Sequence, residues 1–194
     1  MEKIKIVGIG GSLSNYSTSL EALKLALYGA QNLGAEIRLF DVNELNLPMY
    51  HHMIDELPTD AVELCRAVSE ADGLIWSSPL YHGTISGSFK NALDWLELLS
   101  DYTPKYLTGK VVGLISTAGG VQGLQAINTM EYVVRALRGY TLPMVIPVSR
   151  ASKVFDKETG IKDSAIEKQL LTLGKELYLA ARQLSKQTVM SYEL

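Results

Sequence analysis

A segment near the N-terminus, residues 10–19, combines two glycines with a run of hydroxyl side chains just before an expected helix. The glycine pair allows a tight backbone turn, and five hydroxyls follow: Ser12, Ser14, Ser17, Thr18 and Ser19. Free N–H groups and the positive dipole end make a helix N-terminus a favourable site for a phosphate group. No lysine or arginine occurs between Lys5 and Lys24, so neutral donors would hold such a phosphate. A serine-rich helix cap without a ligand accounts for the same residues equally well.

Two other nucleotide-binding motifs fit this segment less well. The run from Gly8 to Leu13 resembles the dinucleotide fingerprint, but Leu13 stands where the third glycine belongs. The P-loop ending, Gly-Lys-Ser/Thr, is absent. Asp41, at the end of the next expected strand, keeps a Rossmann-type NAD(P) site open, because an acidic residue there binds a ribose.

A second loop, residues 79–87, has the composition of a turn beside a flat ring. Pro79 fixes the direction of the chain, and Gly83 and Gly87 permit close approach of the backbone to a ligand. Tyr81 and His82 can line the edge of an aromatic ring, while the loop amides face its polar rim. A flavin needs neighbours of this kind, because the protein binds and orients a cofactor that itself carries the electrons.

A third loop, residues 117–123, follows another expected strand and contains three glycines. Small residues at the end of a strand again allow a ring to approach the backbone. The alternative is an ordinary glycine-rich turn between a strand and a helix.

Together these segments resemble the NAD(P)H-dependent FMN reductase family, which includes bacterial azoreductases, quinone and chromate reductases and the arsenic-resistance flavoproteins. The resemblance spans most of the chain, from the first strand to the fourth helix. Its most specific part is Pro79 to Asp94, which reads Pro-x-Tyr-x-x-x-x-x-Gly-x-x-Lys-Asn-x-x-Asp.

The resemblance implies specific contacts with FMN. For the phosphate these are Ser12, Ser17, Thr18 and Ser19. Along the isoalloxazine ring they are Pro79, Leu80, Tyr81, His82, Gly83 and Thr84. At the pyrimidine side of the ring they are Thr117, Ala118, Gly119 and Gly120, with Gln122 nearby.

Three positions depart from the family pattern. Ser14 stands where members commonly have an arginine, which bears on phosphate binding and on NADPH preference. Leu80 replaces a frequent acidic residue and makes one side of the ring pocket more apolar, and Ser86 replaces a frequent proline.

The implied activity is an FMN-dependent oxidoreductase. NADPH or NADH delivers a hydride to FMN, and the electrons pass to a flavin, a quinone, an azo compound or a metal oxyanion. Nothing in the sequence requires a catalytic acid or base from the chain, because water can supply the protons, and no spacing of Cys, His and Asp residues resembles a metal site. Two alternatives remain at this point: a flavodoxin-type electron carrier without reductase activity, and a Rossmann-type NAD(P) binder without flavin.

The elements that must position these loops alternate along the chain. Strands are expected at 3–9, 35–42, 73–78, 110–117 and 141–148, and helices at 17–33, 59–71, 88–99, 122–138 and 164–185. This alternation predicts a doubly wound α/β fold of three layers, αβα, with a parallel five-stranded sheet in the flavodoxin-like order 2-1-3-4-5. Residues 43–58 and 149–162 are expected to be surface loops.

Individual residues mark several helix ends. We expect Thr59 to cap the second helix, and Gly34 and Gly139 to end the first and fourth helices.

Bulk composition excludes other classes of protein. The length of 194 residues predicts one domain covering 1–194. The net charge of −3 predicts no nucleic-acid partner. No apolar run approaches the roughly 20 residues that cross a bilayer, and no signal-peptide core is present. We therefore expect a cytoplasmic protein without a membrane partner. Cys65 is expected to be a buried thiol, and His51 and His52 to lie in a solvated loop.

The helix at 88–99 is unusually apolar, with Phe89, Leu93, Trp95, Leu96 and Leu99. Core packing explains part of this pattern. Since oligomers of the family use this region, the resemblance implies a homodimer or homotetramer interface for the rest. Lys90 and Asn91 then either reach the partner or lie at a solvated helix start.

Overall fold

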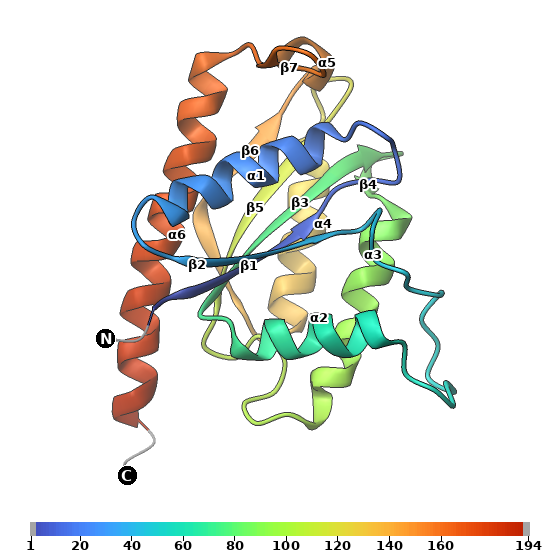
Figure 1. Ribbon diagram of the computed structural model, residues 1–194, viewed down its shortest axis with the longest axis vertical. Coiled ribbons are helices and arrows are strands. Elements are labelled where there is room, and N and C mark those ends of the chain that lie inside the picture. The colour runs from blue at the N-terminus through green and yellow to red at the C-terminus, as the bar shows by residue number, and fades with distance from the viewer. Residues whose placement is uncertain (1–2, 192–194) are drawn as a thin grey trace.

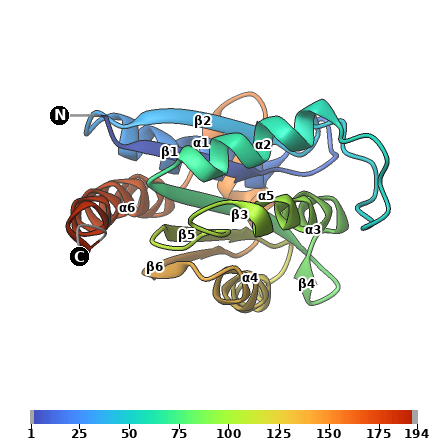
Figure 2. The same cartoon turned by 90° about the horizontal axis from the view of Figure 1, so that it is seen from below.

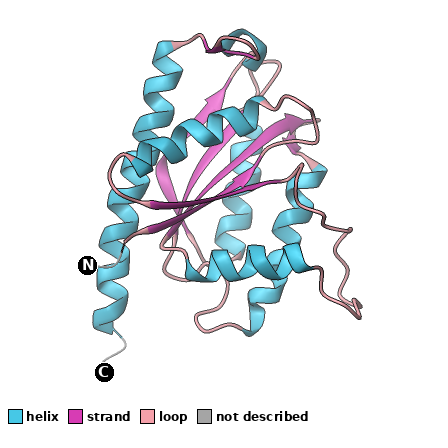
Figure 3. Cartoon of the chain, in the orientation of Figure 1, coloured by secondary structure: helices cyan, strands magenta, loops and turns pink. Residues whose placement is uncertain are grey.

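A computed structural model describes the backbone of residues 3–191 and the side chains of residues 3–185. Five parallel strands form the centre, and helices cover both faces (Figures 1 and 3). The strands are β1 (Lys5–Gly10), β2 (Glu36–Asp41), β3 (Gly73–Tyr81), β5 (Val111–Thr117) and β6 (Tyr140–Val148). The main helices are α1 (Thr18–Gln31), α2 (Thr59–Glu70), α3 (Gly87–Asp94), α4 (Leu124–Ala136) and α6 (Ser164–Ser191). A 3-10 helix, η1 (Trp95–Asp101), continues α3.

The strands lie in the order β2-β1-β3-β5-β6. Because β5 and β6 are the fourth and fifth of the predicted strands, the flavodoxin-like order 2-1-3-4-5 is confirmed. β3, in the middle of the sheet, is buried from Gly73 to Pro79. Two apolar clusters flank the sheet, one beneath α2, α3, η1 and α4, and the other beneath α1 and α6.

Two glycines let α1 and α6 pack with their backbones in contact. A Cβ on Gly174 of α6 would meet the carbonyl oxygen of Ala26 at 1.8 Å, and one on Gly29 of α1 would meet that of Leu171 at 2.2 Å. α6 is the longest helix (Figure 1) and runs past the expected end at residue 185, because no glycine or proline stops it.

β6 forms one edge of the sheet and contains Pro143 and Pro147. Proline lacks an N–H group, so within sheets it is confined to edge strands and bulges. The pairing register with β5 shifts between Val112 and Leu114, which oppose Thr141 and Val145.

Three residues were predicted to mark helix ends, and the structure confirms one of them. Gly34 has a φ of +95°, the conformation expected beyond a helix end, so that prediction is confirmed. The other two are wrong. Thr59 is the first residue of α2, with Pro58 before it and no side-chain cap. The positive φ after α4 falls on Arg138, at +67°, whereas Gly139 leaves room for Leu107 and Val134, each 3.1 Å from a Cβ placed there.

The two expected surface loops differ. Residues 43–58 have no helix or strand, as predicted. Residues 149–162 contain a one-turn helix, α5 (Ala151–Val154), and a hairpin of β7 (Phe155–Asp156) and β8 (Gly160–Ile161). The prediction of a plain loop there was wrong, because Asp156 organises the turn by accepting from the N–H groups of Glu158 and Thr159, both at 3.0 Å.

The apolar residues expected to contribute to an oligomer interface in the 88–99 region lie in the core of the chain. Their exposed fractions range from 0 to 3% for Phe89, Leu93, Trp95, Leu96 and Leu99. Asn91 is likewise buried and bonds to the 43–58 loop, so it does not lie at a solvated helix start. Lys90 is exposed and pairs with Asp94.

Among the described residues, no helix is both long enough and apolar enough to cross a membrane.

Candidate functional site

The three loops singled out in the sequence lie together at the carboxyl edge of the sheet. β1, β3 and β5 are parallel neighbours, with Gly10 opposite Ser77 and Pro79 opposite Thr117. The Thr18 hydroxyl donates to the Thr117 hydroxyl at 3.2 Å, which joins the first loop to the third. Gly11 N–H donates to the Ser77 carbonyl at 3.2 Å, which joins the first loop to β3.

Part of the first loop caps α1. The Ser17 hydroxyl accepts from the N–H of Leu20 at 3.3 Å and lies 3.0 Å from the Ser19 hydroxyl. Ser12, Ser17 and Ser19 are buried, and Thr18 is half-buried. The N–H groups of Thr18 and Ser19 are in the first turn of the helix, where no intrahelical carbonyl reaches them.

Asp41 lies beside the first loop, and its side chain contacts residues close to it. Its carboxylate accepts from the N–H of Asn43 at 3.0 Å, and a Cβ on Gly11 would lie 2.4 Å from the Asp41 Oδ1 atom. Burial is the main cause of the raised pKa of this carboxyl. The Asp41 side chain thus closes the turn after β2, and this structural role explains an acidic residue here without a bound ribose.

The second loop is a hairpin rather than the loop expected from residue 79 onward. β3 continues through Pro79 to Tyr81, turns at His82 and Gly83, and returns as β4 (Thr84–Ile85). Both turn residues have positive φ, +48° and +84°, as a two-residue turn of type I′ requires. The tip is exposed and leans on α4, where the Thr84 hydroxyl donates to that of Thr129 at 3.1 Å (Figure 2).

The third loop is fixed by the segment after β6. Ala151 N–H donates to the Ala118 carbonyl at 2.9 Å, and Arg150 N–H to the Gly120 carbonyl at 2.8 Å. Thr117 and Ala118 are buried, whereas Gly119 and Gly120 are exposed. The Gln122 side chain turns back onto its own loop, because its Oε1 accepts from the N–H of Val121 at 3.2 Å.

These features fit an FMN molecule without a cation at its phosphate. The unpaired N–H groups at the start of α1 and the hydroxyls around them are neutral donors. The exposed hairpin tip and the exposed glycines of the third loop leave backbone available to a flat ring. Tyr16, in the first loop, has a buried hydroxyl with no hydrogen-bond partner among the described residues.

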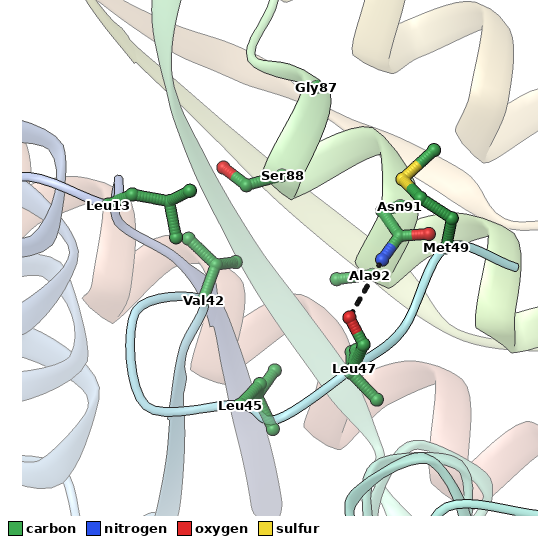
Figure 4. Close-up of a pocket in the computed structure, with 9 residues that line it drawn as sticks. All are labelled: Leu13, Val42, Leu45, Leu47, Met49, Gly87, Ser88, Asn91 and Ala92. Atoms are coloured by element: carbon green, nitrogen blue, oxygen red, sulfur yellow. Dashed lines mark hydrogen bonds between the residues drawn. The ribbon is translucent and has the colours of Figure 1, made fainter.

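Sequence reasoning missed a pocket next to the first loop. Nine residues line it: Leu13, Val42, Leu45, Leu47, Met49, Gly87, Ser88, Asn91 and Ala92 (Figure 4). Asn91 belongs to the motif that carried the family resemblance, yet its role is visible only in three dimensions. It accepts from the N–H of Tyr50 at 2.9 Å and donates to the carbonyls of Pro48, at 3.0 Å, and Leu47, at 3.4 Å.

Cys65, His51 and His52 lie outside the three loops. Cys65 is buried, as predicted, and donates to the Trp95 carbonyl at 3.3 Å. His51 and His52 are exposed in the 43–58 loop, as expected. The described residues contain no group of three or more His, Cys, Asp or Glu side chains able to hold a metal ion.

Known proteins resemble the chain along most of its length. It is 31% identical over 179 residues to the NADPH-dependent FMN reductase ArsH of Shigella flexneri, covering 90% of this chain and 67% of that protein. It is 28% identical over 174 residues to the FMN-dependent NADPH-azoreductase of Staphylococcus haemolyticus, covering 86% of this chain and 88% of that protein. The chain spans about two thirds of the length of its ArsH relatives.

A solved structure supports the fold. FerB, a flavoenzyme NAD(P)H:(acceptor) oxidoreductase from Paracoccus denitrificans, matches with a TM-score of 0.76 at 19% identity, covering 93% of this chain and 98% of that one. A family model described as NADPH-dependent FMN reductase matches residues 4–153, well over half of the chain. The chain therefore belongs to the NADPH-dependent FMN reductase family.

Proposed function

We propose that this chain passes a hydride from NAD(P)H to bound FMN and the electrons onward to a small-molecule acceptor. The observation that carries the proposal is the meeting of three loops at the ends of β1, β3 and β5, held by the Thr18–Thr117 hydrogen bond. FMN, when bound, supplies the redox chemistry, and the chain binds it, orients it and limits the access of water.

Family membership decides between the alternatives left open by the sequence. The chain is an oxidoreductase that works with FMN and NADPH, which confirms the expected enzyme and cofactors. Family membership argues against both a carrier without reductase activity and a Rossmann-type NAD(P) binder without flavin. The free flavin, quinone, azo compound and metal oxyanion remain the proposed acceptors, and the azoreductase relative supports an azo compound among them.

The residue roles in this proposal follow the geometry of the loops. The N–H groups of Thr18 and Ser19, with the Ser12 hydroxyl, bind the phosphate. The Thr18 hydroxyl donates its one proton to Thr117, and Ser17 and Ser19 hold the loop through their mutual contact. The hairpin from Pro79 to Thr84 supports one side of the ring. The third loop, Thr117 to Gly120, flanks the pyrimidine side, with Gln122 keeping its shape. Solvent supplies the protons.

The first test is the visible absorption spectrum of the purified protein, repeated anaerobically after FMN and then NADPH or NADH are added. We expect a bound-flavin spectrum that bleaches rapidly with one of the nucleotides. A flavin that stays oxidised would favour an electron carrier, and failure to bind FMN at all would remove the proposal.

The hairpin assignment has its own test. Tyr81 is 48% exposed at the start of the turn, so Tyr81→Ala removes ring contact without opening the core. We expect the FMN dissociation constant to rise by about tenfold, in line with the energy of one aromatic contact. Tyr140→Ala, at an exposed position outside the three loops, is the control. Unchanged flavin content and turnover in Tyr81→Ala would show that the ring does not lie along the hairpin.

We also propose that residues 1–194 act as one FMN-binding domain, that the chain forms a homodimer or homotetramer, and that it works in the cytoplasm.

A further inference from the structure

The three loops of the proposed flavin site contain no lysine, arginine, aspartate or glutamate. This holds for residues 10–19, 79–87 and 117–123 alike. Neutral donors at a helix start are enough for the FMN phosphate. NADPH differs from NADH by a 2′-phosphate, which dinucleotide-binding proteins recognise with a nearby arginine. A chain that selects NADPH must therefore bring a cation to this edge of the sheet from another segment.

The segment after β6 brings two cations to the third loop. α5 follows β6 directly at this edge (Figure 1). The N–H of Arg150 donates to the Gly120 carbonyl at 2.8 Å, and that of Ala151 to the Ala118 carbonyl at 2.9 Å. These bonds fix the start of the Arg150 side chain beside the exposed glycines of the loop. Lys153 closes the same turn, because its N–H donates to the Arg150 carbonyl at 2.8 Å.

Arg150 has an unusual backbone conformation for an arginine. Its φ is +49°, in the left-handed region that residues with a Cβ seldom adopt. Glycine or asparagine would fit this position at a lower cost. Backbone outliers of this kind cluster at ligand-binding sites. The conformation therefore favours a role for the side chain of Arg150 and not only for its backbone.

The charges of Arg150 and Lys153 are available to a ligand. Both side chains are exposed, and neither belongs to an ion pair within the part of the chain that the structure describes. The acidic residue nearest to them in the sequence, Asp156, accepts instead from a lysine and two N–H groups of its own hairpin. By contrast, Lys24 of α1 and Lys90 of α3 are each paired with an acidic residue of the same helix.

We propose that Arg150, with Lys153 beside it, binds the 2′-phosphate of NADPH and makes the chain prefer NADPH to NADH. A guanidinium suits this role because it donates two parallel hydrogen bonds to phosphate oxygens. The inference rests on the proposed function and assigns the residues that select its electron donor. It also supplies a cation for that selection where the first loop has Ser14 instead of an arginine.

A binding test separates the 2′-phosphate from the rest of the nucleotide. The probes are 2′,5′-ADP, which carries the 2′-phosphate but no nicotinamide, and 5′-AMP, which lacks it. Titration calorimetry with the FMN-loaded protein should show tighter binding of 2′,5′-ADP. We expect Arg150→Gln to weaken 2′,5′-ADP binding by about tenfold or more, the value of one hydrogen bond to a charged group. The affinity for 5′-AMP should change little.

Two further variants make that loss specific. Arg150→Lys keeps the charge but not the paired donors, so it should weaken 2′,5′-ADP binding by only a few-fold. Arg135→Gln is the matched control, since it removes the same charge from an exposed residue in the last turn of α4. It should bind both probes like the unmodified protein.

A turnover test compares kcat/KM for NADPH and NADH, with ferricyanide as the acceptor. We expect the NADPH-to-NADH ratio to fall by about tenfold in Arg150→Gln, mainly through a higher KM for NADPH, and by a smaller factor in Lys153→Gln. The FMN content of each variant is measured first. If Arg150→Gln does not fold, Arg150→Lys and Lys153→Gln provide the same comparison.

The proposal is overturned if Arg150→Gln binds 2′,5′-ADP as Arg135→Gln does, or if it weakens NADPH and NADH equally. Loss of FMN from folded Arg150→Gln and Lys153→Gln would also overturn it, because the two cations would then hold the FMN phosphate. Absence of flavin bleaching by either nucleotide in the unmodified protein would instead overturn the proposed function. Binding of 2′,5′-ADP would still report on Arg150 in that case, so the two failures are distinguishable.

Discussion

Hydroxyl side chains in the first loop illustrate what residue types alone leave undecided. Ser17 and Ser19 were expected to bind a phosphate, but their hydroxyls lie 3.0 Å apart and Ser17 also caps α1. Serine has both a donor and acceptors, so one sequence serves a cap or a ligand. The sequence predicted that these loops follow the carboxyl ends of neighbouring strands, whereas the orientation of each hydroxyl depends on packing between residues distant in the chain, such as Thr18 and Thr117.

Asn91 shows a similar limit. As part of the family motif it was expected near a partner subunit or solvent, yet it holds a loop more than forty residues earlier in the chain. No local pattern reveals such a contact, because the amide pairs with backbone groups that every residue possesses.

Cys65 gives a prediction at the level of one side chain. Burial raises the pKa of its thiol to about 12, and only the thiolate is a good nucleophile. We expect no reaction with Ellman's reagent at pH 8 in the folded protein, and release of one thiol equivalent per chain in guanidinium chloride. Rapid labelling of the native protein would show that this part of α2 opens readily.

Regular elements were predictable where their pattern was strong. The five main strands are apolar runs with glycines nearby, and each was expected within about three residues of its observed start. Short elements were missed. β4 pairs through only Thr84 and Ile85, and the hairpin of β7 and β8 is equally short. Such strands have too few residues for a periodic pattern and depend on their turns.

The contact between α1 and α6 gives a prediction at the level of elements. In an isolated helix, glycine to alanine is stabilising by up to about 1 kcal/mol. Here Gly174→Ala would force the two helices apart, because a Cβ would collide with the Ala26 carbonyl. We expect a loss of about 3 kcal/mol in the free energy of unfolding, measured by urea denaturation.

Lys175→Ala is the control for that measurement, since Lys175 is the exposed neighbour in the same helix. It should change the stability by less than about 0.5 kcal/mol. A Gly174→Ala protein as stable as this control would mean that α1 and α6 are not in close contact.

At the scale of the whole molecule, oligomeric state is a prediction that the single chain leaves open. The apolar residues of the 88–99 region are used in the core of their own chain. An interface would have to use exposed residues instead, among them Tyr132 on α4, which is 72% exposed. We expect light scattering to give a mass two or four times the 21.3 kDa of the chain. A mass of one chain at micromolar concentration would contradict a stable homodimer or homotetramer.

The prolines of β6 constrain how copies of the protein can associate. An unpaired strand edge is a template for another chain, and proline blunts it by removing donors from the open row. With Pro143 and Pro147 on this edge, a neighbouring molecule cannot extend the sheet there by regular strand addition. The same feature protects concentrated or freshly synthesised protein from polymerising through this edge, so copies that associate would have to use the helical faces or β2, the strand at the other edge of the sheet.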